Sequence, residues 1–125
     1  MDKYIVDPDK LPKHVAVIMD GNRRWAKSKF LPVKLGHKAG AETFKKMMEW
    51  CIDIGIKYLT VYAFSTENWK RNQEEINDIM DLLRNYLKSN KEELNKNGIN
   101  VKVIGESQNV DIDILEEIRE VEKLT

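Results

Sequence analysis

The sequence predicts an α/β fold in which a parallel sheet is flanked by helices in a Rossmann-like arrangement. Two short apolar runs, residues 15–19 and 58–64, are rich in β-branched or aromatic residues. Runs of this length and composition are typical of buried parallel strands. Stretches with helical periodicity follow each run, and the alternation of strand and helix indicates right-handed crossover connections.

Along the chain, residues 1–13 contain Pro8 and Pro12 and predict an irregular lead-in. The first strand is expected from His14 to Asp20, followed by a basic, turn-rich segment through Pro32. A helix is predicted from about Gly36 to Ile54, because its apolar residues recur at helical spacing. Gly55 is well placed to end that helix in a left-handed conformation.

The second strand is predicted over Tyr58–Phe64, and a second helix from Gln73. We expect that helix to break near Ser89 and Asn90 and to resume as far as Asn97, where Gly98 ends it. Residues 99–103 alternate apolar and polar, which predicts a third, half-exposed strand at a sheet edge. Asp111 or Asp113 is expected to start a last helix.

We expect residues 1–125 to form a single domain. Three strands make a thin sheet for this architecture. The sequence therefore predicts the N-terminal half of a larger domain.

Composition excludes several classes of protein. Lys plus Arg and Asp plus Glu each number 21, so the net charge is zero, which argues against a general nucleic-acid binder. The single cysteine, Cys51, forms no internal disulfide, as expected in a reducing cytoplasm. No apolar run approaches the length of a membrane span, so we expect a soluble, cytoplasmic protein.

Polar residues cluster after both predicted strands, from Asp20 to Trp25 and from Ser65 to Arg71. The carboxyl ends of parallel strands meet at one edge of a sheet, where ligands of open α/β sheets bind. The first cluster offers a carboxylate for a metal, backbone N–H groups and two guanidinium forks. This set suits a diphosphate bound with Mg²⁺.

Each of these residues also has a simpler interpretation. Asp20, Gly21 and Asn22 are common turn residues. His37 could cap a helix or contact a phosphate. In the second cluster, Glu67 and Asn68 could simply form the first turn of the second helix. Trp69 could be a core residue, and Arg71 could be a solvated surface charge. From these patterns alone we infer an α/β domain that binds a phosphorylated ligand with a metal.

Three segments carry a resemblance to a known family: HVAVIMDGNRRWAK at 14–27, GHKAG at 36–40 and YAFSTENWKR at 62–71. In this order and at these separations they resemble the cis-prenyltransferases, the undecaprenyl diphosphate synthase family. The resemblance covers roughly residues 14–105. It implies the undecaprenyl diphosphate synthase fold, here its N-terminal half.

The resemblance implies a Z-type prenyltransferase. Such an enzyme condenses isopentenyl diphosphate repeatedly with an allylic diphosphate, such as farnesyl diphosphate, to give a long-chain polyprenyl diphosphate. In a bacterium the product is expected to carry cell-wall sugars and to bring the enzyme to the membrane surface. The family also implies Mg²⁺ as cofactor and a homodimer, with no nucleic-acid partner.

Carried over by position, Asp20 matches the family's catalytic aspartate, which serves Mg²⁺ and diphosphate departure. Asn68 matches the proton acceptor or its organiser, and we expect it to orient groups, because a neutral amide is a poor base. Met19 and Ala63 fall where the family's apolar tunnel begins, and the helix from Gln73 resembles a tunnel wall. The remaining matches are expected to bind substrate: Gly21, Asn22, Arg23, Arg24, Trp25, His37, Ser65, Glu67, Trp69 and Arg71.

The sequence departs from the family pattern in two places. Many bacterial members have an arginine where this chain has Val33, and Lys34 cannot reproduce a bidentate fork. The family's isopentenyl diphosphate motif and second acidic ligand do not occur in these 125 residues, so we expect the chain alone to be inactive.

Two other functions compete with the enzyme. A non-catalytic or truncated accessory subunit would act by association, although intact Asp20 and Asn68 argue against it. A nucleotide or RNA binder could use basic and aromatic side chains near the first cluster. Those side chains are Arg23, Arg24, Lys27, Lys29, Trp25 and Phe30. The zero net charge and the absence of any RNA-binding module argue against this function.

Overall fold

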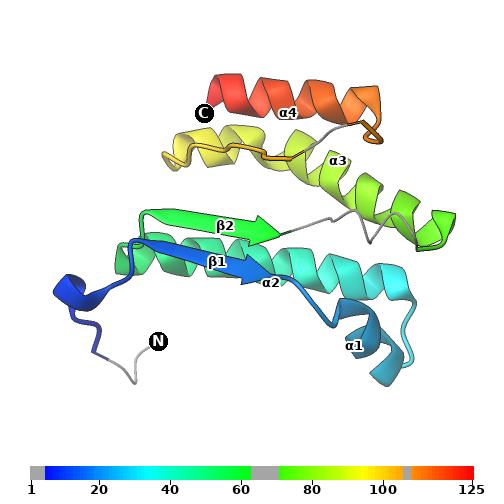
Figure 1. The fold of residues 1–125 in the computed structure, drawn as a ribbon, viewed down its shortest axis with the longest axis horizontal. Coiled ribbons are helices and arrows are strands. Elements are labelled where there is room, and N and C mark those ends of the chain that lie inside the picture. The colour runs from blue at the N-terminus through cyan, green and yellow to red at the C-terminus, as the bar shows by residue number, and fades with distance from the viewer. Residues whose placement is uncertain (1–4, 63–70, 106–107) are drawn as a thin grey trace. The chain divides into compact units, whose positions relative to one another are not determined.

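The structure is a computed structural model that describes residues 5–62, 71–105 and 108–125. These residues divide into two compact units, Met1–Asn72 and Gln73–Thr125. Strands and helices alternate in the first unit and helices fill the second, so the predicted α/β class is confirmed (Figure 1). The elements in order are η1 (Pro8–Lys10), β1 (His14–Ile18), α1 (Asn22–Ser28), α2 (Val33–Ile54), β2 (Tyr58–Tyr62), α3 (Gln73–Lys96) and α4 (Ile112–Leu124).

The first unit is built on the parallel strands β1 and β2. Their register runs from His14 opposite Tyr58 to Ile18 opposite Tyr62, so the chain leaves both strands at the same edge. Helices α1 and α2 connect them, and α2 runs behind both strands in Figure 1. The first strand is shorter than predicted, and the last two predicted residues of the second lie outside the described residues.

The prediction that both strands are fully buried is wrong. Alternate residues of β1 and β2 are exposed, so only one face of the pair is covered. The side chains of Ile18 and Tyr62 are 76% and 56% exposed on the other face. At the amino end of that face, His14 and Thr60 share a hydrogen bond of 2.7 Å between Nε2 and Oγ1.

The basic segment after β1 was predicted to be turn-rich, and that prediction is wrong for most of it. Residues 22–28 form helix α1, with Gly21 as its N-cap at φ 84°. No apolar periodicity marks this segment as a helix. Ala26 is the one fully buried side chain of α1. Seven residues are too few for a stable isolated helix, so packing against α2 decides the conformation.

Helix α2 begins three residues before the prediction, at Val33, with Pro32 as its N-cap. It ends at Ile54, as predicted. Gly55 adopts φ 93° and donates its N–H to the carbonyl of Cys51 at 3.1 Å. Ile56 donates to the same carbonyl at 2.9 Å, so the predicted glycine cap is confirmed.

Helix α3 of the second unit starts at Gln73, as predicted, but it does not break at Ser89 and Asn90. Asn90 remains helical and donates its side-chain amide to the carbonyl of Tyr86 at 3.0 Å. Leu87 and Leu94, on either side, are both 4% exposed. Burial of this apolar face holds the helix together through two residues of modest helix propensity.

The predicted third strand is also wrong, because residues 99–103 do not form a strand. Their backbone bonds elsewhere. The N–H of Ile99 donates to the carbonyl of Leu94 at 3.0 Å, and the N–H of Val101 donates to the hydroxyl of Thr125 at 2.9 Å. The segment therefore caps α3 and contacts the end of α4.

Helix α4 follows Asp111, one of the two predicted start positions, and packs against α3 through the fully buried Ile114 and Val121. Arg84 of α3 forms ion pairs with Asp81, Asp111 and Asp113. Lys91 pairs with Glu120 at 2.7 Å and Glu117 at 3.5 Å. Two cations of α3 thus fix the position of α4.

We expect Arg84→Met to lower the melting temperature near neutral pH. The hydrogen bond from Arg84 lowers the pKa of Asp113 in the folded protein. The interaction therefore stabilises the fold fully above the pKa of an aspartate in the unfolded chain, about 3.9. It is lost as the pH falls through the lowered folded pKa. In thermal melts from pH 7 to pH 2, the difference in melting temperature between Arg84→Met and wild type should shrink as the pH falls. Arg119→Met, at an exposed α4 position, is the control and should lower the melting temperature less. A pH-independent difference would assign the whole effect to lost packing.

Within the described ranges, no helix has the length and apolar character needed to cross a membrane.

Candidate functional site

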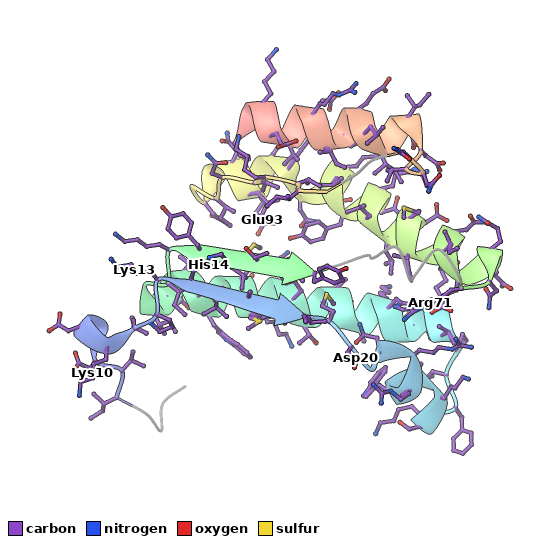
Figure 2. All side chains as sticks on the ribbon, viewed as in Figure 1. Lys10, Lys13, His14, Asp20, Arg71 and Glu93 are labelled. Carbon is purple, nitrogen blue, oxygen red and sulfur yellow. The ribbon has the colours of Figure 1, made fainter. Side chains whose placement is uncertain are left out.

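Asp20 lies just beyond the carboxyl end of β1, at the opposite end of the strand from His14 (Figure 2). Its Oδ1 is 3.1 Å from Nη2 of Arg24, one helical turn further along the chain. The side chains of Asp20 and Arg24 are 78% and 77% exposed. An exposed pair of this kind contributes at most about 1 kcal/mol, so a polyanion can readily displace the carboxylate from the guanidinium.

Gly21 makes the turn between β1 and α1. Its φ of 84° is left-handed, a conformation that residues with a β-carbon rarely adopt. Its carbonyl accepts the N–H of Trp25 at 2.8 Å, the first bond of α1. This turn brings Arg24 back over the carboxylate of Asp20.

The rest of the first cluster is divided between solvent and α2. Arg23 is exposed, and the side chain of Trp25 is 44% exposed, so a guanidinium and an aromatic face are accessible beside Asp20. Asn22 is half-buried, and its side-chain amide lies against Gly40 of α2.

His37 is the fifth residue of α2 and is half-buried. The interpretation of His37 as a helix cap is wrong, because α2 begins at Val33 with Pro32 as its N-cap. A contact with substrate stays a prediction for this residue. Val33 and Lys34, where the sequence departs from the family pattern, form the first turn of the same helix.

The second predicted cluster is largely outside the described residues. Ser65, Glu67, Asn68 and Trp69 all lie there, as does Ala63. Arg71 is described, is half-buried and belongs to the first unit. The register of β1 and β2 sends both following segments from one sheet edge, but contact between the two clusters stays a prediction.

The donor set near Asp20 fits one kind of metal site. No group of three or more His, Cys, Asp or Glu residues that could enclose a metal occurs within residues 5–62, 71–105 and 108–125. Mg²⁺ does not need such a group, because it commonly binds one or two carboxylates together with waters and substrate phosphates. The exposed carboxylate of Asp20 fits that role, and Mg²⁺ remains a proposal.

Sequence reasoning missed the structural importance of Gly36 and Gly40. Both are buried, and α1 packs against α2 at these two positions. The signal was present, because glycines four residues apart share one face of a helix and let another backbone approach.

Comparison with known proteins decides the family. Residues 18–125 match the family model described as "Putative undecaprenyl diphosphate synthase". The chain belongs to this family. The predicted family is therefore confirmed, on a match that spans α1, both long helices and α4.

Relatives of the synthase family support the assignment. The isoprenyl transferase of Clostridium tetani is 56% identical over 105 residues, which are 84% of this chain and 41% of that protein. The isoprenyl transferase of Aquifex aeolicus is 51% identical over 96 residues, 77% of this chain and 42% of that protein. The chain thus spans less than half the length of these relatives.

A solved structure confirms the synthase fold. The chain resembles lavandulyl diphosphate synthase from Lavandula x intermedia, crystallised in complex with dimethylallyl diphosphate, with a TM-score of 0.86 and 33% identity. The match covers 90% of this chain and 49% of that one.

Proposed function

We propose that this chain carries the allylic-diphosphate half of a Z-prenyltransferase site. The observation that carries the proposal is the exposed Asp20–Arg24 pair at the carboxyl edge of the strands. Family membership supports it, and so does the likeness to lavandulyl diphosphate synthase, which was crystallised in complex with an allylic diphosphate. The substrate class would be an allylic diphosphate such as farnesyl diphosphate.

The chemistry begins with departure of diphosphate from the allylic carbon, during which negative charge grows on the leaving group. Positive groups that already stand at that position lower the barrier. Arg24 would bind the diphosphate through its guanidinium fork, and Arg23 would add a second. Mg²⁺ held by Asp20 would supply further positive charge when bound. Trp25 would limit access of water to the reacting carbon.

The hydrocarbon tail needs an apolar surface that begins at the diphosphate site. Ile18 and Tyr62 are neighbours in the sheet register, are largely exposed and are the last residues of β1 and β2. We propose that the prenyl tail starts along this face. The predicted start of the tunnel at Met19 and Ala63 agrees with this position in sequence, and Asn68 would orient the reacting groups.

The activity of the longer relatives is proposed only for a protein that contains this chain. It would condense isopentenyl diphosphate repeatedly into a long-chain polyprenyl diphosphate, as a cytoplasmic homodimer. Condensation requires two bound diphosphates with reacting carbons about 3–3.5 Å apart. We assign one of the two diphosphate sites to these residues, so the chain alone should bind substrate without elongating it.

An accessory subunit acting by association is the second candidate. Exposed apolar side chains favour it, including Ile104 of the second unit at 88% exposure. Such a subunit would need neither Asp20 nor a diphosphate.

Calorimetric titration separates these functions. We expect farnesyl diphosphate to bind with Mg²⁺ and to bind much more weakly after chelation with EDTA. Single-stranded RNA at the same ionic strength serves as a competing polyanion and should bind weakly. RNA binding tighter than that of the diphosphate would support the nucleic-acid alternative, and failure to bind the diphosphate would support the accessory subunit.

A further inference from the structure

The backbones of α1 and α2 come unusually close at Gly36. A β-carbon built on Gly36 would stand 2.2 Å from the backbone oxygen of Asn22 and 2.8 Å from Cβ of Ala26. Both distances are far shorter than ordinary carbon contacts, which are about 3.5–4.0 Å. No side chain larger than hydrogen fits at this position without moving α1.

Gly40 lies one turn later on the same face of α2 and meets a different part of α1. A β-carbon there would stand 2.3 Å from Nδ2, 2.7 Å from Cγ and 2.8 Å from Oδ1 of Asn22. Gly36 therefore receives the backbone of Asn22, whereas Gly40 receives its side-chain amide. Ala26, fully buried, completes the contact.

This contact determines where the charged groups of α1 stand. The helix has seven residues, so its position depends on α2 rather than on its own stability. It starts directly after Gly21 and carries Arg23, Arg24 and Trp25. Catalytic geometry is sensitive to such placement, because a displacement of about 1 Å can cost about a hundredfold in rate.

We propose that Gly36 and Gly40 are positioning residues for the diphosphate site, and that Asn22 acts through its contact with Gly40 rather than as a ligand of the diphosphate. The inference rests on the proposed function, because it concerns where Arg24 stands relative to Asp20. It revises the role that the family resemblance implied for Asn22. Alanine favours helices more than glycine does, so a loss caused by Gly→Ala reflects this contact and not helix propensity.

The test is a double-mutant cycle with two measurements, the dissociation constant of farnesyl diphosphate with Mg²⁺ and hydrogen exchange at α1 and the turn that follows it. The amides followed are those of Trp25 and Leu31, bonded to the carbonyls of Gly21 at 2.8 Å and Ala26 at 2.9 Å. We expect Gly40→Ala to weaken binding roughly tenfold or more and to speed exchange of both amides.

Asn22→Ala removes all three atoms that the new β-carbon would meet. The Asn22→Ala/Gly40→Ala double variant should therefore recover affinity to within about twofold of Asn22→Ala alone, with slow exchange restored. Gly36→Ala should not be rescued by Asn22→Ala, because the backbone oxygen remains. Glu42→Ala, at an exposed position of α2, serves as a control that should bind like the parent.

Gly40→Ala that binds like the parent would overturn the inference. The inference would also fail if Asn22→Ala lost as much affinity as Gly40→Ala and the double variant recovered none of it. Asn22 would then be a direct ligand of the diphosphate. A parent chain that binds no diphosphate contradicts the proposed function, whereas a parent that binds but shows no rescue contradicts only the positioning role.

Discussion

Replacing Asp20 with alanine is expected to abolish the Mg²⁺-dependent part of allylic diphosphate binding. In a catalytically complete protein it should lower condensation by about a hundredfold or more, the usual cost of removing one electrostatic contact to a developing charge. Mg²⁺ commonly binds one or two carboxylates together with waters and substrate phosphates, and Asp20 is the carboxylate that we propose for this role. Loss of this carboxylate should therefore remove the ligand to Mg²⁺ that we propose within this chain.

The fold should survive this change. The side chain of Asp20 is 78% exposed, and its ion pair with Arg24 is a surface pair worth at most about 1 kcal/mol. The measurements are titration of farnesyl diphosphate over a range of Mg²⁺ concentrations, and circular dichroism to confirm folding. Asp53→Ala, which removes an exposed carboxylate near the end of α2, is the matched control. Near-parental Mg²⁺ dependence in Asp20→Ala would reject the metal role.

Replacing Arg24 with alanine is expected to weaken allylic diphosphate binding by about 1.5–3 kcal/mol, the cost of losing a hydrogen bond to a charged group. This corresponds to a ten- to hundredfold rise in the dissociation constant, roughly. The guanidinium is 77% exposed, so its loss should leave the melting temperature almost unchanged. In this variant the affinity for the diphosphate should fall while the stability of the fold stays almost the same.

Arg24→Lys distinguishes charge from shape. Lysine restores the positive charge without the planar fork, so we expect it to recover only part of the lost affinity. Arg119→Ala, which removes an exposed arginine from α4, controls for the change in net charge. An unchanged dissociation constant for Arg24→Ala would remove this residue from the diphosphate site.

Local chemical signals determined much of this fold without tertiary information. Gly55 ends α2 because a residue in the left-handed conformation does not continue a right-handed helix. Gly98, with φ 73°, follows α3 for the same reason. The two apolar runs identified both strands, since β-branched residues fit a pleated surface. The family was evident in the same way, because its motifs specify side-chain chemistry at fixed spacing.

The strand pair also determined where the first cluster would stand. Asp20 follows β1, and the parallel register sends both strands toward one edge, as the sequence predicted. In the second cluster the structure describes Arg71, whereas residues 65–69 lie outside the described residues, so their predicted roles rest on the sequence alone.

Only tertiary structure decided the remaining features, because each depends on a partner distant in sequence. Helix α1 exists through its contact with Gly36 and Gly40, which no pattern within residues 22–28 reveals. Residues 99–103 alternate like a strand, but their N–H groups bond to Leu94 and Thr125. An alternating pattern specifies which side chains can be buried together, whereas a strand needs a second strand to accept its hydrogen bonds.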